Sequence, residues 1–233
     1  MDFQRMLDYC AALEKHNERA WFHEHHRQYE EARADWYTLL NRLRFVIAGA
    51  APALSQDILY MQPRDWTYRI ARDMRYYKDR PPYNPSFRAY LSADRKSWLP
   101  IGYFLRISAG DSCFGTGIWF EDTASVNIVR DYLMEHYDRW EELVAECGLP
   151  ISGSTLKKMP RGYPEEHPAA PWLKYKDWSV IQDIPREELT TFDDFEEIIR
   201  RLTERMEPLR LFWLEAAQSG RTQRQALGDF YRY

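Results

Sequence analysis

The sequence predicts an α+β domain in which a mostly antiparallel sheet is flanked by N- and C-terminal helices. Helical periodicity comes first, alternation of apolar and polar residues follows, and helical periodicity then returns, which is the order typical of α+β proteins. Apolar residues make up 45% of the 233 residues and aromatic residues 15%, enough for a sizeable core. No linker composition divides the chain, so we expect one domain over 1–218 and a loosely held tail over 219–233.

Helices are expected at the start of the chain and strands after them. The spacing of apolar residues predicts helices over 3–14 and 31–48, and Asn17 is expected to cap a short helix between them. Alternating polarity predicts a first strand over 67–75, with its turn at 79–85. The remaining elements are strands over 86–92, 102–108 and 113–120, helices over 124–135 and 137–147, a proline-rich loop over 149–177, a strand over 178–182, and a helix over 192–218 that Gly220 ends.

Bulk properties exclude several classes of protein. The net charge of −4 excludes a globally basic nucleic-acid binder, although residues 69–106 hold nine Lys/Arg against three Asp. The three cysteines lie far apart, so no disulfide framework or zinc knuckle is expected. The N-terminus has no apolar core typical of a signal peptide, and no apolar run is long enough to span a bilayer. A cytoplasmic protein without a membrane partner is predicted, and its oligomeric state is left open.

The most informative segment is 69–83, RIARDMRYYKDRPPY. It holds five cationic side chains and only two carboxylates, so about three positive charges lack an internal partner within it. Arginine forks bind phosphates and carboxylates in a bidentate manner, which predicts a site for a small anion. Arg72 falls on the apolar face of the predicted strand, where a buried guanidinium needs a partner. The residues of this segment expected to bind the ligand are Arg69, Arg72, Arg75, Asp79 and Arg80.

Two further residues of the segment are candidate catalytic groups. Asp73, like Asp79, is expected to orient the arginines or to act as a base, and Tyr83 to donate a proton. An arginine clamp also stabilises developing negative charge, which is compatible with an enzyme acting on the anion.

The loop over 149–177 contains a second group of polar residues. Gly162 and its proline neighbours predict a fixed conformation for this loop. Arg161 and Lys174 are expected to bind the ligand, and His167 to transfer protons near neutral pH. If the loop folds over the arginine segment, the two form one basic pocket.

Other functions stay open at this point. The arginines and aspartates are also compatible with a purely structural salt-bridge ladder or with a surface that binds a protein partner. A set of tyrosines lies among the basic residues and is able to stack nucleic-acid bases: Tyr76, Tyr77, Tyr83 and Tyr90. GxSxG, SxxK, GxGxxG and P-loop motifs are absent, and His23-Glu24-His25-His26 is not an HExxH motif. No cofactor and no metal are predicted.

Four features in a fixed order carry a resemblance to a known family. They are Asn17 before Trp21-Phe22, RxxRDxR at 69–75, Gly102-Tyr103 before the glycines at 115 and 117, and Pro160-Arg161-Gly162-Tyr163 before His167 and Lys174. Over about residues 3–217 the sequence resembles the domain-of-unknown-function 2461 family of bacterial and fungal proteins. Tyr76 stands where that family usually has phenylalanine, and Arg80 where it usually has lysine. The resemblance implies no particular activity, and the tail lies outside it.

Overall fold

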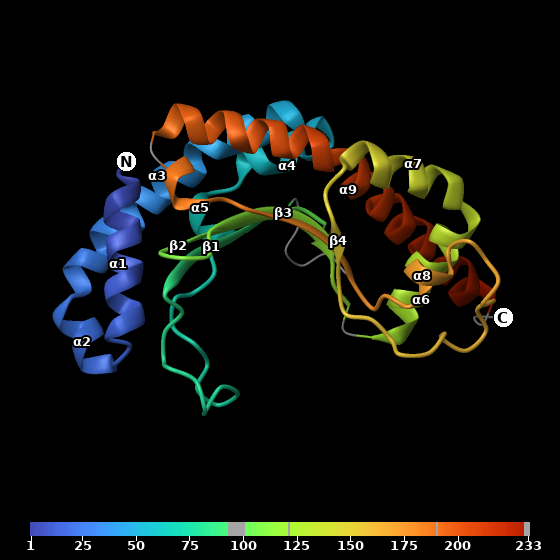
Figure 1. Cartoon of the computed structure of the whole chain (residues 1–233), viewed down its shortest axis with the longest axis horizontal. Coiled ribbons are helices and arrows are strands. Elements are labelled where there is room, and N and C mark those ends of the chain that lie inside the picture. The colour runs from blue at the N-terminus through green and yellow to red at the C-terminus, as the bar shows by residue number, and fades with distance from the viewer. Residues whose placement is uncertain (93–100, 121, 190, 231–233) are drawn as a thin grey trace. The chain divides into compact units, whose positions relative to one another are not determined.

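The computed structural model describes residues 1–92, 101–120, 122–189 and 191–230, except for the side chains at 55 and 221–230. It confirms the predicted α+β class, with an antiparallel sheet in the strand order β1-β2-β3-β5-β4 between N- and C-terminal helices (Figure 1). The strands are β1 (Ser86–Leu91), β2 (Tyr103–Ser108), β3 (Cys113–Ile118), β4 (Ile151–Ser152) and β5 (Trp178–Asp183).

The helices begin and end close to several of the predicted positions. They are α1 (Phe3–Lys15), α2 (Arg19–Glu24), α3 (His26–Ala50), α4 (Pro52–Tyr60), α5 (Pro63–Trp66), α6 (Thr123–Glu135), α7 (Tyr137–Cys147), α8 (Ala170–Leu173), α9 (Phe192–Phe230) and the 3-10 turn η1 (Arg186–Glu188). The prediction that Gly220 ends the last helix is wrong, because α9 continues to Phe230. One glycine costs a helix only about 1 kcal/mol, too little to stop it alone.

The chain divides into two compact units whose segments interleave along the sequence. The first unit comprises Met1–Arg95, Tyr103–Phe114 and Gln182–Thr203. The second comprises Lys96–Gly102, Gly115–Ile181 and Glu204–Tyr233. The expectation of one domain over 1–218 stays a prediction.

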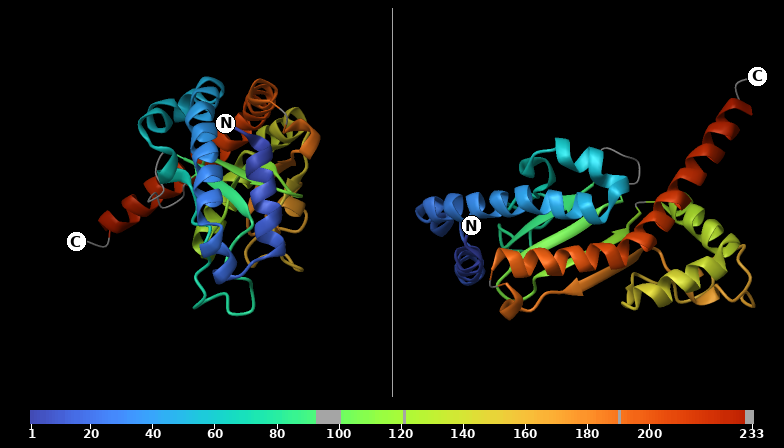
Figure 2. Two further views of the ribbon diagram at one scale, coloured as in Figure 1. Left: turned by 90° about the vertical axis from the view of Figure 1, so that its left-hand side faces the viewer. Right: turned by 90° about the horizontal axis from the view of Figure 1, so that it is seen from above.

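In the first unit, α1 and α3 run side by side and pack against β1 and β2 (Figure 2). The antiparallel register of these strands pairs Phe87 with Ile107 and Ala89 with Leu105, and all four side chains are buried. Trp36 of α3 stacks on Phe87 with 5.9 Å between ring centroids. This apolar layer holds the start of β1 firmly, which matters because the residues just before β1 build the candidate site.

In the second unit, aromatic side chains of three helices meet around the buried Trp140 of α7. The ring centroid of Trp140 lies 5.2 Å from that of Phe212 in α9 and 5.4 Å from that of Trp172 in α8. Gly117 of β3 permits a close approach of neighbouring groups to the backbone. A β-carbon there would lie 2.7 Å from the carbonyl oxygen of Trp178 in β5 and 2.9 Å from the indole ring of Trp119, so the strand and the ring occupy that space.

Candidate functional site

The arginine segment lies in an irregular antiparallel arm, residues 67–85, that precedes β1. The predicted strand over 67–75 is therefore wrong. Isolated bridges join Thr67 to Ala89 and Ala71 to Tyr83, but no continuous ladder forms. The chain turns at the tip of the arm, where the carbonyl oxygen of Asp73 accepts hydrogen bonds from the backbone amides of Tyr76 and Tyr77. On the returning side the residues at 81 and 82 are prolines, which have no amide hydrogen to extend a ladder.

Asn17 fixes the base of this arm to the N-terminal helices. Its side-chain amide donates to the carbonyl oxygen of Tyr83 at 3.1 Å and accepts from the amide of Tyr83 at 3.0 Å. The predicted role of Asn17 as a helix cap is wrong, because Glu18 occupies that position and makes no side-chain capping bond. The ring of Tyr83 is buried and stacks on Phe22 with 4.2 Å between ring centroids. Packing therefore explains why an aromatic residue stands at this position.

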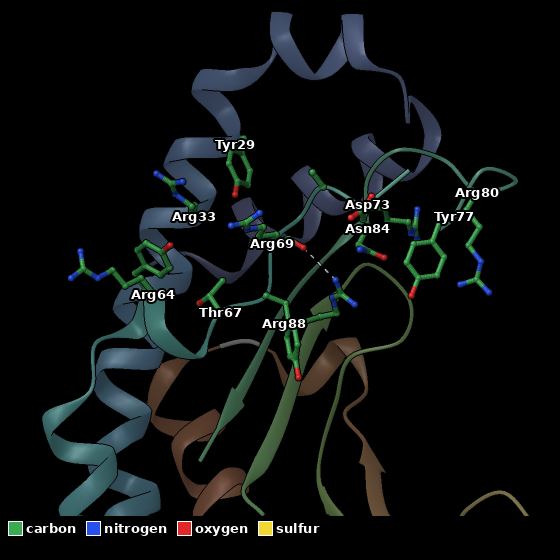
Figure 3. A pocket seen from close by; sticks show the side chains of 14 residues that line it. Tyr29, Arg33, Arg64, Thr67, Arg69, Asp73, Tyr77, Arg80, Asn84 and Arg88 are labelled. Carbon is green, nitrogen blue, oxygen red and sulfur yellow. Dashed lines mark hydrogen bonds between the residues drawn. The ribbon is translucent and has the colours of Figure 1, made fainter. Parts of the chain in front are cut away.

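A cavity of about 760 Å³ opens between the arm, α3, α5 and β1, and Figure 3 shows the side chains around it. Its lining belongs entirely to the first unit. The lining consists of six arginines (Arg33, Arg64, Arg69, Arg72, Arg80 and Arg88), four tyrosines (Tyr29, Tyr37, Tyr68 and Tyr77), and Thr67, Ala71, Asp73 and Asn84.

The lining contains a single carboxylate, and that carboxylate is already engaged. Both oxygens of Asp73 accept hydrogen bonds from the guanidinium of Arg75, at 2.6 to 3.2 Å. These bonds hold the pKa of Asp73 below its usual range. Asp73 therefore orients an arginine, as predicted, but it does not neutralise the arginines of the cavity.

Two of the six arginines have acidic partners and four have none within the described residues. Arg33 pairs with Glu30, and Arg64 with Asp65 at 3.8 Å. The four whose guanidinium groups contact no carboxylate in the described parts of the chain are Arg69, Arg72, Arg80 and Arg88.

Arg72 has backbone carbonyl groups, not carboxylates, as its partners within the described residues. Its Nη1 donates to the carbonyl oxygen of Pro81 at 2.7 Å and also to that of Tyr83. These neutral acceptors satisfy the donors without cancelling the charge. Burial lowers the pKa of Arg72, and the charge of Arg80 lowers it further.

Arg88 of β1 is a site residue that the sequence analysis missed. It is half-buried, and within the described residues its Nε is buried without a hydrogen-bond partner while its Nη2 donates to the carbonyl oxygen of Arg69 at 3.4 Å (Figure 3). Burial lowers its pKa, and the charges of Arg72 and Arg106 lower it further. The one available signal was an arginine in the middle of a predicted strand with apolar neighbours.

Tyrosine rings contact several of these arginines, including two that have no carboxylate partner within the described residues. The guanidinium of Arg88 lies 5.5 Å from the ring of Tyr68, and that of Arg80 lies 5.6 Å from Tyr77. Arg33 lies 5.4 Å from the ring of Tyr29. Cation–π contacts hold a guanidinium in place and leave its charge available to a ligand.

The other predicted site residues lie outside the cavity. Arg75 and Asp79 are exposed on the arm, and Asp79 contacts no arginine within the described residues. Arg161, His167 and Lys174 belong to the second unit. There the Nδ1 of His167 accepts a hydrogen bond from the amide of Ala169 at 3.1 Å, and the ring lines a separate hollow with His136. The joining of this loop and the arginine arm into one pocket stays a prediction.

Two kinds of feature are absent from the parts of the chain that the structure describes, a membrane-spanning helix and a metal cluster. No helix there has the length and apolarity needed to cross a membrane. No group of three or more His, Cys, Asp or Glu side chains there is arranged to hold a metal ion.

Comparison with known proteins agrees with the resemblance in the sequence. The family model described as "Conserved hypothetical protein (DUF2461)" matches residues 5–212, and this range contains every residue that lines the cavity. No curated protein and no solved structure matches the chain.

Proposed function

The chain belongs to the DUF2461 family of conserved hypothetical proteins, and from its own residues we propose that it binds a small phosphate- or carboxylate-bearing ligand in the arginine cavity. The observation that carries this proposal is the group of four cavity arginines without a carboxylate partner among the described residues, Arg69, Arg72, Arg80 and Arg88. Arg72 and Arg88 are half-buried, whereas Arg69 and Arg80 are exposed. Arg80 repels Arg72 and Arg72 repels Arg88, and an anion reduces that repulsion while it gains charge-assisted hydrogen bonds.

Binding is the minimal form of the proposal, and catalysis is not required by the geometry. Asp73 has a lowered pKa and two hydrogen bonds from Arg75, so it is a weak base at neutral pH. The ring of Tyr83 packs against Phe22 rather than lining the cavity. The arginines are suited both to holding an anion and to stabilising additional negative charge on it.

Thermal unfolding with a panel of anions tests the proposal. The panel contains phosphate, pyrophosphate, sugar phosphates and dicarboxylates. A ligand at 100 times its dissociation constant stabilises the protein by about 2.7 kcal/mol, or roughly 5–10 °C for a chain of this size. Arg69→Gln is the sharpest variant, because the Arg69 side chain makes no hydrogen bond, ion pair or cation–π contact with another described residue, so its replacement is expected to leave the fold intact.

The matched control is Arg201→Gln, since Arg201 is exposed on α9 and is not part of the cavity lining. We expect an anion to raise the Tm of the wild type and of Arg201→Gln, and to raise that of Arg69→Gln by less than half as much. Equal shifts in all three proteins, or none in the wild type with any anion, would contradict the proposal.

A second candidate function is binding of single-stranded nucleic acid along the arm. The observation in its favour is Tyr76 at the tip, whose side chain is 79% exposed, next to the exposed Arg75 and Lys78. An exposed aromatic ring beside cations suits the stacking of bases and contact with phosphates. The salt dependence of binding separates this function from the first.

A further inference from the structure

The unpaired charges of the cavity exceed what one phosphate neutralises. Four arginines there lack acidic partners among the described residues, whereas a phosphate monoester carries a charge of about −2 at neutral pH. The guanidinium groups of Arg69, Arg88 and Arg80 are also spread across the cavity (Figure 3). A single compact anion would leave some of them without a partner, so this distribution favours a ligand with two or more linked anionic groups.

The size and chemistry of the cavity add a second constraint. Its volume of about 760 Å³ lies within the range of about 300–1,000 Å³ that is typical of sites for whole metabolites. Ala71 is the only aliphatic side chain in the described lining, so an acyl chain would find no aliphatic surface beyond one methyl group. The four tyrosines instead offer planar faces.

Tyr77 presents such a face on the side of the cavity formed by the tip of the arm. Its side chain is 47% exposed, and within the described residues its ring is contacted by the guanidinium of Arg80 but by no second aromatic ring. A planar ring that stacks on Tyr77 would therefore complete a partly built aromatic site.

Asn84 lines the same cavity as Tyr77 and supplies polar groups to it (Figure 3). Its backbone amide donates to Ile70 and its carbonyl accepts from Ser86, whereas its half-buried side-chain amide makes no hydrogen bond within the described residues. A carboxamide offers an adjacent donor and acceptor, the pair that recognises the edge of a heterocycle such as adenine.

We propose that the ligand is a nucleoside di- or triphosphate, with its base on Tyr77 and Asn84 and its phosphates on Arg69, Arg72 and Arg88. This inference rests on the proposed anion-binding function. The one carboxylate in the lining, Asp73, is engaged by Arg75, and the arginines take the place of a metal ion at the phosphates. We therefore expect binding to be unchanged by EDTA.

Calorimetry with ADP, pyrophosphate and adenosine, each in EDTA, tests the inference. In the wild type ADP is expected to bind at least about tenfold more tightly than pyrophosphate, because the stacked base adds to the phosphate contacts. Tyr77→Leu is expected to lose about that factor for ADP and to keep its affinity for pyrophosphate, whereas Tyr77→Phe keeps both. The matched control Tyr76→Leu removes a neighbouring exposed tyrosine outside the lining and is expected to change neither.

The outcomes separate this inference from the function on which it rests. If pyrophosphate or a dicarboxylate binds and ADP binds no more tightly, the nucleotide is wrong and the anion site stands. If Tyr77→Leu and Tyr76→Leu weaken ADP equally, the base is not held at Tyr77 and the inference is overturned. If no anion binds the wild type, both proposals fall. A further titration with a 5′-phosphorylated oligonucleotide distinguishes a free nucleotide from the end of a nucleic acid. We expect ADP to bind more tightly than the oligonucleotide.

Discussion

At the scale of single residues, Arg88 connects the stability of the protein with its proposed function. It is half-buried without a carboxylate partner in the described residues, and the strand register places it directly opposite Arg106 of β2. Like charges opposite each other on antiparallel strands destabilise the pair. Such a residue costs the empty protein stability, and sites of this kind are retained where a ligand uses the charge.

Replacing Arg88 by methionine is therefore expected to stabilise the empty protein while it weakens anion binding. Methionine keeps the length and packing of the side chain and removes the desolvated charge. We expect the Tm without ligand to rise by roughly 2–4 °C, corresponding to about 1 kcal/mol, and the shift caused by pyrophosphate to shrink. Differential scanning calorimetry with and without pyrophosphate measures both effects.

Arg106→Met is the matched control for this experiment. Arg106 lies across the strand pair from Arg88, but it forms an ion pair with Asp111 at 2.9 Å and is not part of the cavity lining. Its replacement removes the ion pair with Asp111 but also relieves the like-charge repulsion with Arg88, so these effects oppose each other and the Tm is expected to change by less than about 2 °C, with the pyrophosphate shift unchanged. A Tm of Arg88→Met below that of the wild type would show that the Arg88 charge is already compensated in the empty protein.

The sequence indicates some of the residues that line the cavity, but it does not indicate which groups their side chains contact. The sequence pattern singles out Arg72 on an apolar face, but it does not indicate that the donors of Arg72 reach the carbonyl oxygens of Pro81 and Tyr83, nine and eleven residues onward. That reach depends on the shape of the arm, which the alternation of residues does not encode. Arg88 was missed because one polar residue on a strand is ordinary, and Asn84 because asparagine is ordinary in a turn.

At the scale of elements, the arm over 67–85 shows where local patterning stops being sufficient. Helices such as α1 and α7 follow from apolar spacing, and Gly148 ends α7 in the left-handed conformation as its sequence predicts. The arm alternates in polarity as a strand does, but prolines and a tight turn leave it only isolated bridges. Its conformation is instead held from outside by Asn17.

Asn17→Ala tests whether this anchor holds the arm. It leaves the amide and the carbonyl of Tyr83 without their partner in a partly buried place, which is expected to lower the free energy of unfolding by about 1–3 kcal/mol. Pyrophosphate binding is expected to weaken as well, because Arg72 bonds to the same carbonyl group. Urea unfolding and calorimetry measure the two changes. The control Asn41→Ala removes an exposed side-chain amide of α3 that makes no hydrogen bond within the described residues, and it is expected to change neither quantity. If Asn17→Ala has the same urea midpoint of unfolding as the wild type, Asn17 does not anchor the arm.

At the scale of the whole molecule, the order of helices, strands and helices was sufficient to predict the α+β class. The division into two units was not predictable in the same way, because each unit gathers three separate stretches of sequence. Local periodicity reports which face of an element is apolar but not which distant segment covers it. The charge distribution follows the same logic: the net charge of −4 gives no sign of a cavity lined by six arginines and one aspartate.

This charge distribution predicts how salt affects binding. A small diphosphate meets the cavity arginines alone, so its affinity is expected to fall less than about tenfold between 50 and 200 mM salt. An oligonucleotide extends beyond the arginines over a molecule of net negative charge, and is expected to bind weakly with a much steeper dependence. Calorimetry with pyrophosphate and fluorescence anisotropy with a labelled oligonucleotide, at matched salt concentrations, measure the two slopes. One outcome would favour the nucleic-acid function over the small-anion site. In it the oligonucleotide binds tightly with a steep salt dependence, Tyr76→Leu loses that binding, and pyrophosphate does not bind.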